Sequence, residues 1–279
     1  MKNYYSVFIS KPLLFIAVIT AFAVLAGCLP KTNPPTGGGT AKTPLENVAA
    51  FDSSETINSS YAMQAVDLYT DPANAATGTD SARTNWLRSR HRFERVRFAV
   101  EQFDWTNFQA QFAQWFPNPQ FGYHAIEIFL FSSTPNAANA EQKALTLYGQ
   151  LSELPTVIQP STITDAGIFK GLEHMLADID TIKFSKADSL YSRNSVNDIF
   201  SNYEGLDTVI NYYYQANSTT LQASDSVFNL RYQAAWNAML QDSASFYTNF
   251  NKQAYETGYL YPLDTAVAHV AAALELSIQ

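Results

Sequence analysis

Apolar side chains recur three and four residues apart along most of the chain beyond residue 80, which is the period of an amphipathic α-helix. The clearest stripes are Trp86, Phe93, Val96 and Val100, and then Leu263, Val267, Val270 and Leu274 after Pro262. Asp80-Ser81 and Thr164-Asp165 stand where side-chain oxygens can cap helices. The pattern therefore predicts a chain that is nearly all helix, with about seven or eight helices.

Prolines separate the predicted helices, because proline cannot continue a helix without losing a hydrogen bond. Pro117 and Pro119 fall in one loop, and Pro155 and Pro160 break the chain again. Helices are expected at residues 82–103, 123–131, 139–152, 165–182, 194–215, 222–250 and from 262 onwards. They should pack as antiparallel helical bundles in two bundle-like halves, at about 46–157 and 161–279.

Composition supports an all-α fold with a sizeable core. Only 11 of the 279 residues are glycine, and neither Asn-Gly nor Asp-Gly, the strongest short hairpin signals, occurs. Apolar residues make up 47% of the chain and aromatic residues 14%, which is enough to form a core. The net charge of −8 leaves no basic excess to neutralise phosphates, so we expect no nucleic-acid partner.

The N-terminus is typical of an export signal. Lys2 and Lys11 precede an uncharged apolar run of 14 residues, 13–26, which is shorter than the ~20 residues of a membrane-spanning helix. The run ends in Leu-Ala-Gly-Cys, which resembles the bacterial lipobox, and Cys28 is the only cysteine of the chain. We therefore expect residues 1–27 to be a lipoprotein signal peptide and Cys28 to be lipidated. The alternative is a plain secretory signal with an incidental cysteine.

Residues 28–45 carry the predicted lipidated cysteine and then a linker rich in proline and glycine, so the folded body should begin near residue 46. A chain with one cysteine forms no intramolecular disulfide. The expected location is the cell envelope, with the protein held at a membrane by its lipid. Residue 29 is leucine rather than aspartate, which by resemblance to sorting rules favours the outer membrane, facing either the periplasm or the cell surface.

One local motif could carry chemistry. Gly122-Tyr123-His124-Ala125-Ile126-Glu127 places an imidazole and a carboxylate three residues apart, on one face of a helix, where both can reach one metal ion. The alternative is a structural His–Glu hydrogen bond. Because the neighbouring residues are strongly apolar, Glu127 needs a partner if it is buried. Nucleophile-elbow, P-loop, dinucleotide-binding and H-E-x-x-H motifs are absent from the sequence.

Residues 122–131, GYHAIEIFLF, resemble the Gly-x-His-x-x-Glu signature of the imelysin-like family, which includes the periplasmic lipoprotein of the ferrous-iron Efe transport system. The segment from Arg83 to Val96 is similar to the Ala-Arg…Tyr-Glu-Arg-Ile-Glu helix of that family. Residues 180–205 are similar to its Thr-Lys-Ile…Tyr-Ser-His…Asn-Val-Glu-Gly segment. The resemblance covers most of residues 46–279.

The resemblance implies an all-α imelysin-like fold of two bundle-like halves with a metal site built around the motif. Its ligands in this sequence would be Glu94, His124 and Glu127, converging in one polar pocket of the first half. The bound ion would be a divalent or ferric metal ion, with iron as the candidate. Several residues depart from the iron-transport branch, which is acidic or has histidine at these places: Arg97, Gln109, Gln111 and Arg193. Such a site is expected to be weak, altered or without metal.

Three functions remain open from the sequence. The first is an envelope lipoprotein that binds or handles a metal ion in iron-linked uptake. The second is a metal-free helical interaction module that serves an iron permease or an envelope peroxidase or other redox protein. The third is a peptidase, which ranks lower because a hydrolytic zinc site needs three protein ligands and a general base, and Ile128 rather than histidine follows Glu127.

Other polar and aromatic residues have plainer interpretations. Glu204 is either a ligand from the second half or an ordinary helix carboxylate. His91, His174 and His269 are expected to be solvated or structural. Tyr212–Tyr214 are expected to pack in a core or an interface, with a sugar or haem platform as the alternative.

Overall fold

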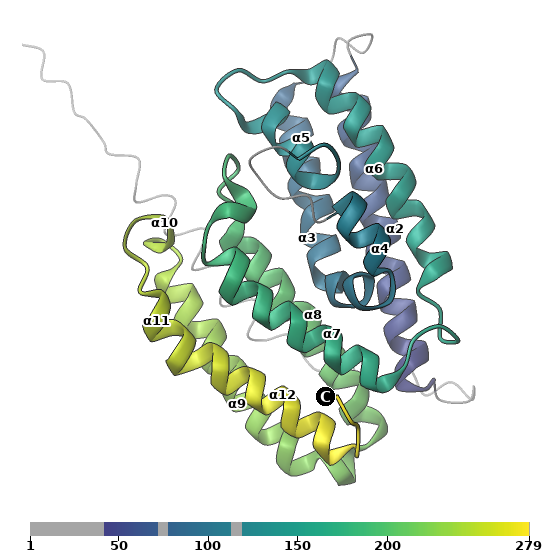
Figure 1. Ribbon diagram of the computed structural model, residues 1–279, viewed down its shortest axis with the longest axis vertical. Helices are drawn as coiled ribbons and strands as arrows, with labels where there is room; N and C mark the ends of the chain where they lie inside the picture. Colours follow the sequence, from purple (N-terminus) through teal and green to yellow (C-terminus); the bar gives the residue numbers. More distant parts are fainter. Residues whose placement is uncertain (1–41, 72–77, 113–118, 279) are drawn as a thin grey trace, which may run out of the picture. The chain divides into compact units, whose positions relative to one another are not determined.

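The computed structural model of the protein describes residues 42–71, 78–112 and 119–278 (Figure 1). These residues form α-helices joined by short π and 3₁₀ turns, with no strand among them, so the predicted all-α helical-bundle class is confirmed. The predicted signal peptide, Cys28 and nearly all of the linker lie outside the described residues. No described helix combines the length and the apolar character needed to cross a bilayer.

The long helices are α2 (Pro44–Thr70), α3 (Thr79–Phe103), α5 (Gly122–Phe131), α6 (Ala137–Val157), α7 (Asp165–Asp178), α8 (Ser195–Ala216), α9 (Ser218–Asp242) and α12 (Tyr261–Ala273). The shorter helices are α4 (Trp105–Asn107), α10 (Phe246–Asn249) and α11 (Lys252–Tyr255). The π turns are η1 (Phe108–Phe112), η2 (Ile179–Lys183) and η4 (Glu256–Leu260), and η3 (Ala187–Ser189) is a 3₁₀ turn.

Capping residues fix several helix ends. Thr43 and Glu46 form a reciprocal capping box that starts α2 within the segment predicted to be linker. The predicted cap of α7 is confirmed, because the Thr164 hydroxyl accepts a hydrogen bond from the Gly167 amide at 3.1 Å. The predicted cap of α3 is wrong: Gly78 is the capping residue, and Asp80 lies in the first turn and pairs with a nearby arginine.

Two predicted helix ends also differ from the structure. Helix α6 continues through Pro155 to Val157, although proline has no N–H for a helical hydrogen bond, and only two residues of the helix follow it. Helix α9 ends at Asp242, and a turn then leads to the short helix α10, instead of one helix reaching residue 250. Apolar periodicity alone does not reveal the turn between α9 and α10, because the buried Phe246 continues the apolar pattern of α9.

Two apolar clusters form the core. One lies among α2, α3, α5 and α6, and the other lies mainly among α7, α8, α9 and α12. Helix α3 packs against α2 and also against α7 and α8, so it borders both clusters (Figure 1). The described residues all belong to one compact unit, and the division into two halves stays a prediction.

Helices α3 and α8 approach each other very closely at Gly205. A Cβ atom at this position would lie 2.8 Å from the carbonyl carbon of Arg95 and would overlap its carbonyl oxygen. Because the obstructing atoms belong to the helix backbone, they cannot turn aside as a flexible side chain would. The absence of a side chain at Gly205 therefore sets the distance between α3 and α8, on which the buried polar contacts described below depend.

One buried acid lies apart from these contacts. The side chain of Asp52 in α2 is fully buried, and neither of its carboxylate oxygens has a hydrogen-bond partner in the described structure. Burial raises the pKa of Asp52 well above its ordinary value of 3.8. The folded protein therefore retains a proton on Asp52 that the unfolded chain releases.

Replacing Asp52 by leucine is expected to raise the free energy of unfolding at pH 7 by about 1–3 kcal/mol, because it removes a buried unsatisfied group. The stability of the wild type should fall as the pH rises from 3.8 toward the higher folded-state pKa, because only the unfolded chain ionises in that window. Asp52→Asn, which cannot titrate, should lose this slope. Urea denaturation at pH 4 and pH 7 measures both effects, and the same slope in Asp52→Asn would contradict the assignment.

Candidate functional site

The motif glycine has a specific structural role at the start of α5. Gly122 has a φ angle of +73°, in the left-handed region that L-residues rarely adopt. A Cβ atom there would also overlap the carbonyl oxygen of Gln111. This tight entry places His124 and Glu127 on the inner side of α5, where they are 2% and 0% exposed.

The two polar residues of the motif contact each other and the loop before α8. His124 Nδ1 lies 3.4 Å from Glu127 Oε2. Glu127 Oε1 accepts hydrogen bonds from the backbone amides of Tyr191 at 3.0 Å and Ser192 at 2.7 Å. On its other side, His124 Nε2 lies 3.2 Å from Asp188 Oδ1. The expectation that a buried Glu127 needs a partner is confirmed, and its partners include two backbone amides far along the chain.

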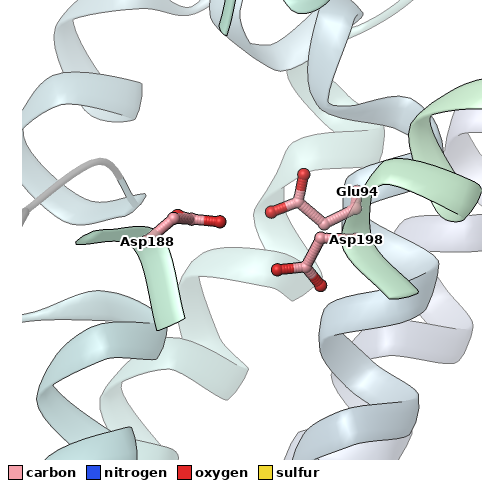
Figure 2. A group of neighbouring side chains, drawn as sticks. All are labelled: Glu94, Asp188 and Asp198. Atoms are coloured by element: carbon pink, nitrogen blue, oxygen red, sulfur yellow. The ribbon is translucent and has the colours of Figure 1, made fainter. Parts of the chain in front are cut away.

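Next to this pair lies a group of five buried charged residues, named here the charge cluster: Arg90, Glu94, Lys183, Asp188 and Asp198. Arg90 and Glu94 come from α3, Lys183 ends η2, Asp188 lies in η3 and Asp198 in the first turn of α8. The three carboxylates point toward a common centre (Figure 2). One oxygen from each lies within 4.8 Å of the others, a spacing that could hold a metal ion.

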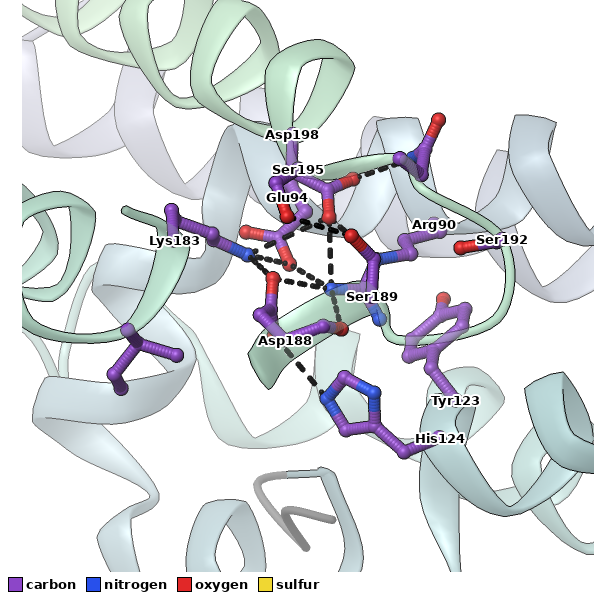
Figure 3. Close-up of polar contacts among 12 residues, drawn as sticks. Arg90, Glu94, Tyr123, His124, Lys183, Asp188, Ser189, Ser192, Ser195 and Asp198 are labelled. Carbon is purple, nitrogen blue, oxygen red and sulfur yellow. Dashed lines mark hydrogen bonds and ion pairs between the residues drawn. The ribbon is translucent and has the colours of Figure 1, made fainter. Parts of the chain in front are cut away.

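Two side-chain cations of the chain itself occupy this centre (Figure 3). Lys183 Nζ donates to Glu94 Oε1 at 2.8 Å and to Asp188 Oδ2, and it lies 3.6 Å from Asp198 Oδ2. Arg90 Nε donates to Asp198 Oδ2 at 2.8 Å, and Arg90 Nη2 donates to Asp188 Oδ2 at 2.7 Å. Each acid of the charge cluster therefore contacts at least one buried cation.

The surroundings shift the pKa values of the three carboxyl groups in different directions. Burial opposes ionisation of Asp188, but Arg90 and Lys183 outweigh it and hold the pKa of Asp188 well below its ordinary value. Burial likewise opposes ionisation of Glu94, but Lys183 and nearby arginines lower its pKa. For Asp198 burial prevails over the same two cations and raises its pKa to about 7. Asp188 and Glu94 are therefore ionised at neutral pH.

The predicted ligands Glu94, His124 and Glu127 belong to one network of buried polar contacts, but the three do not meet at one point. Glu94 bonds to Lys183 and accepts from Asn202 Nδ2 at 3.0 Å, and no hydrogen bond or ion pair of the described residues joins it to His124 or Glu127. Asp188 bridges the two groups, since it contacts both His124 and Lys183. Metal binding by Glu94, His124 and Glu127 stays a prediction.

The fit of a metal ion can be judged from the donor set and its occupants. Carboxylate oxygens with a neighbouring imidazole are suitable ligands for hard cations such as iron. However, the ammonium group of Lys183 takes the position at which Glu94, Asp188 and Asp198 would hold the ion. The residues present therefore do not fit a metal ion while Lys183 is charged and in place.

Other residues singled out in the sequence lie outside the charge cluster. The alternative of Glu204 as a ligand finds no support in its position, because it is partly exposed and pairs with His91 Nε2 and Arg95 Nε, each at 3.4 Å. Arg97, which stands where the related helix has an acid, pairs with Asp178 and lies 3.5 Å from Glu101 Oε2. Tyr213 is buried and donates to Asp165, which agrees with the packing interpretation.

Sequence reasoning missed most of the charge cluster. Arg90, Lys183, Asp188 and Asp198 were not assigned to the site. The sequence does contain a signal that Arg90 is buried, because it lies on the same helical face as the apolar Trp86 and Phe93. A charged residue on a buried face requires a counter-charge, even though the sequence does not say where that charge lies.

Comparison with known proteins adds no assignment. No protein-family model matches the chain, and no curated protein matches it significantly. The imelysin-like resemblance therefore rests on the motifs in the sequence.

Proposed function

We propose that this chain is an imelysin-like lipoprotein, anchored in the cell envelope through Cys28, that works as a metal-free helical interaction module of an iron-linked system. Its partners would be an iron permease or an envelope redox protein. The observation that supports this proposal is the position of Lys183 Nζ among the carboxylates of Glu94, Asp188 and Asp198.

Exchanging the Lys183 ammonium for a metal ion would cost free energy. Lys183 is fully buried, and its ammonium is surrounded by carboxylate oxygens. A metal ion entering the same place would have to expel the ammonium from its partners, and a displaced buried charge is costly. In this function the charge cluster fixes α3 against the segment from Lys183 to Asp198, and it gives the module a rigid body.

Direct metal handling is the second candidate function. It is favoured by the 4.8 Å grouping of the three carboxylates and by His124, which contacts one of them. In this function Lys183 has to leave the centre when the ion binds. Loss of the imidazole in His124→Ala would weaken binding about tenfold or more.

Metal content separates the two functions. A Cys28→Ser protein, purified without its lipid, is expected to contain no stoichiometric metal and to give no binding heat with Fe²⁺, Zn²⁺ or Cu²⁺. Lys183→Ala, which leaves the carboxylates without their ammonium, should gain binding of at least one of these ions, whereas Lys252→Ala, which removes a surface lysine, should not. A wild-type protein that binds one ion per chain, and loses it in His124→Ala, would establish the second function.

Sedimentation with membranes tests the proposed lipid anchor separately from the proposed function. In cells that express the full chain, the wild type should sediment with membranes, and Cys28→Ser should move to the soluble fraction. If Cys28→Ser still sediments entirely with membranes, the lipid anchor is wrong.

A further inference from the structure

A cleft of about 470 Å³ lies between the C-terminal end of α3 and α7, outside the charge cluster. Its polar and aromatic lining consists of Glu101, Gln102, Trp105, Lys170, His174 and Asp178. The volume falls within the range of about 300–1,000 Å³ that is usual for small-molecule sites. The proposed function uses none of these residues, so an inference about the cleft goes beyond it.

The aromatic residue of the cleft is unusually exposed. Trp105 is 54% exposed, whereas Trp86 is fully buried in the core. Phe108 supports it, with the ring centroids 6.0 Å apart and the ring planes 28° from parallel. An indole that is supported by a second ring and open to solvent offers a flat apolar surface next to polar groups, which is the kind of surface that binding sites use.

The charges around the cleft balance. Two acids, Glu101 and Asp178, both pair with Arg97, which lies behind them, and Lys170 provides a second cation. Glu101 is only 7% exposed, and its carboxylate is thereby held in position. Two negative and two positive side chains favour neither a metal ion nor a polyanion. They do provide hydrogen-bond acceptors and donors for an uncharged polar ligand.

We propose that this cleft binds neutral hexopyranose units of a glycan. One face of such a sugar ring carries C–H groups and is apolar, so it can lie against Trp105. Its hydroxyl groups can donate to the carboxylates of Glu101 and Asp178 and accept from Lys170 and Gln102. This combination of a flat apolar face and a rim of hydroxyls matches the lining of the cleft better than an apolar or charged ligand does.

The test uses isothermal titration calorimetry and tryptophan fluorescence on the Cys28→Ser protein. The probes are maltohexaose, cellohexaose and chitohexaose as neutral hexopyranose chains, with hexagalacturonate as a charged chain. At least one neutral probe should bind and change the fluorescence. Trp105→Ala should weaken binding at least tenfold, and Trp105→Phe, which keeps an aromatic face, should weaken it less. Tyr61→Ala, which removes an aromatic residue of 62% exposure from α2, should bind as the wild type does.

Three outcomes would overturn the proposal. They are binding of no neutral probe, binding of hexagalacturonate alone, and equal binding by the wild type and Trp105→Ala. Because Trp105 is largely exposed, its replacement should leave the melting temperature nearly unchanged, and circular dichroism of the variant checks this. Metal binding plays no part in the measurement, so its result is independent of the proposed function.

Discussion

Lys183→Met is expected to lower the free energy of unfolding by about 3–5 kcal/mol, the usual effect of removing one partner from a buried ion pair. The substitution keeps most of the side-chain volume but leaves Glu94, Asp188 and Asp198 facing one another with Arg90 as the only cation of the charge cluster. Urea denaturation at pH 7 measures the loss. Removing an acid at the same time, as in Lys183→Met with Asp188→Asn, should recover a large part of it.

Lys252→Met is the matched control for this prediction. Lys252 also pairs with two acids, Asp180 at 2.9 Å and Glu256 at 3.1 Å, but its side chain is 46% exposed. Water screens such a pair, so its loss should cost at most about 1 kcal/mol. Equal losses for the two methionine variants would show that Lys183 does not carry the buried charge described here.

Gly205→Ala is expected to cost about 3 kcal/mol, at the upper end of the usual range for overpacking. The new methyl group would meet the backbone of Arg95, so α3 and α8 would have to move apart. This movement would also stretch the hydrogen bonds from Asn202, which donates to the backbone and side chain of Glu94 at 2.8 and 3.0 Å. The preference of helices for alanine over glycine, about 1 kcal/mol, offsets only part of the loss.

Gly149→Ala separates packing from helix propensity. Gly149 lies inside α6, and a Cβ atom there would meet nothing within 4 Å. The same substitution should therefore leave stability unchanged or raise it by up to about 1 kcal/mol. If Gly205→Ala is as harmless as Gly149→Ala in thermal and urea denaturation, the close approach of α3 and α8 is incorrect.

Most of the long helices beyond residue 78 were predictable because apolar periodicity is a local property, whereas α2 was not among the predicted helices. The start of α7 followed from the capping residues Thr164-Asp165, and α8 was placed within a residue or so of both ends. The errors arose where local signals compete. Asp80 is a good capping residue, yet the cap is Gly78, two residues before it, and the helix begins at Thr79, three residues before the predicted start. Pro155 has no backbone N–H to continue a helix, yet α6 includes it and ends two residues later, at Val157.

The candidate site was only partly predictable, for a different physical reason. His124 and Glu127 share one helical turn, so their spacing predicted their contact. The partners of Arg90 and Glu94 lie in η2, η3 and the start of α8, and no local pattern links them to α3. Asp188 lies in a single 3₁₀ turn, where no helical face marks it as buried. Long-range pairing of charges is a property of the folded chain and not of any short window.

The charge cluster also bears on the order of events during synthesis. It joins residues 89 to 108 positions apart, since Glu94 meets Lys183 and Arg90 meets Asp198. At the usual rate of about 5–20 residues per second, α3 is made roughly 5–20 s before its counter-charges. During that interval Arg90 and Glu94 have partners only within α3, such as their own ion pair, and they lack Lys183, Asp188 and Asp198. The first four long helices therefore cannot complete their native packing. A chain shortened after α6 should accordingly stay loosely packed and depend on chaperones, instead of behaving as an independent domain.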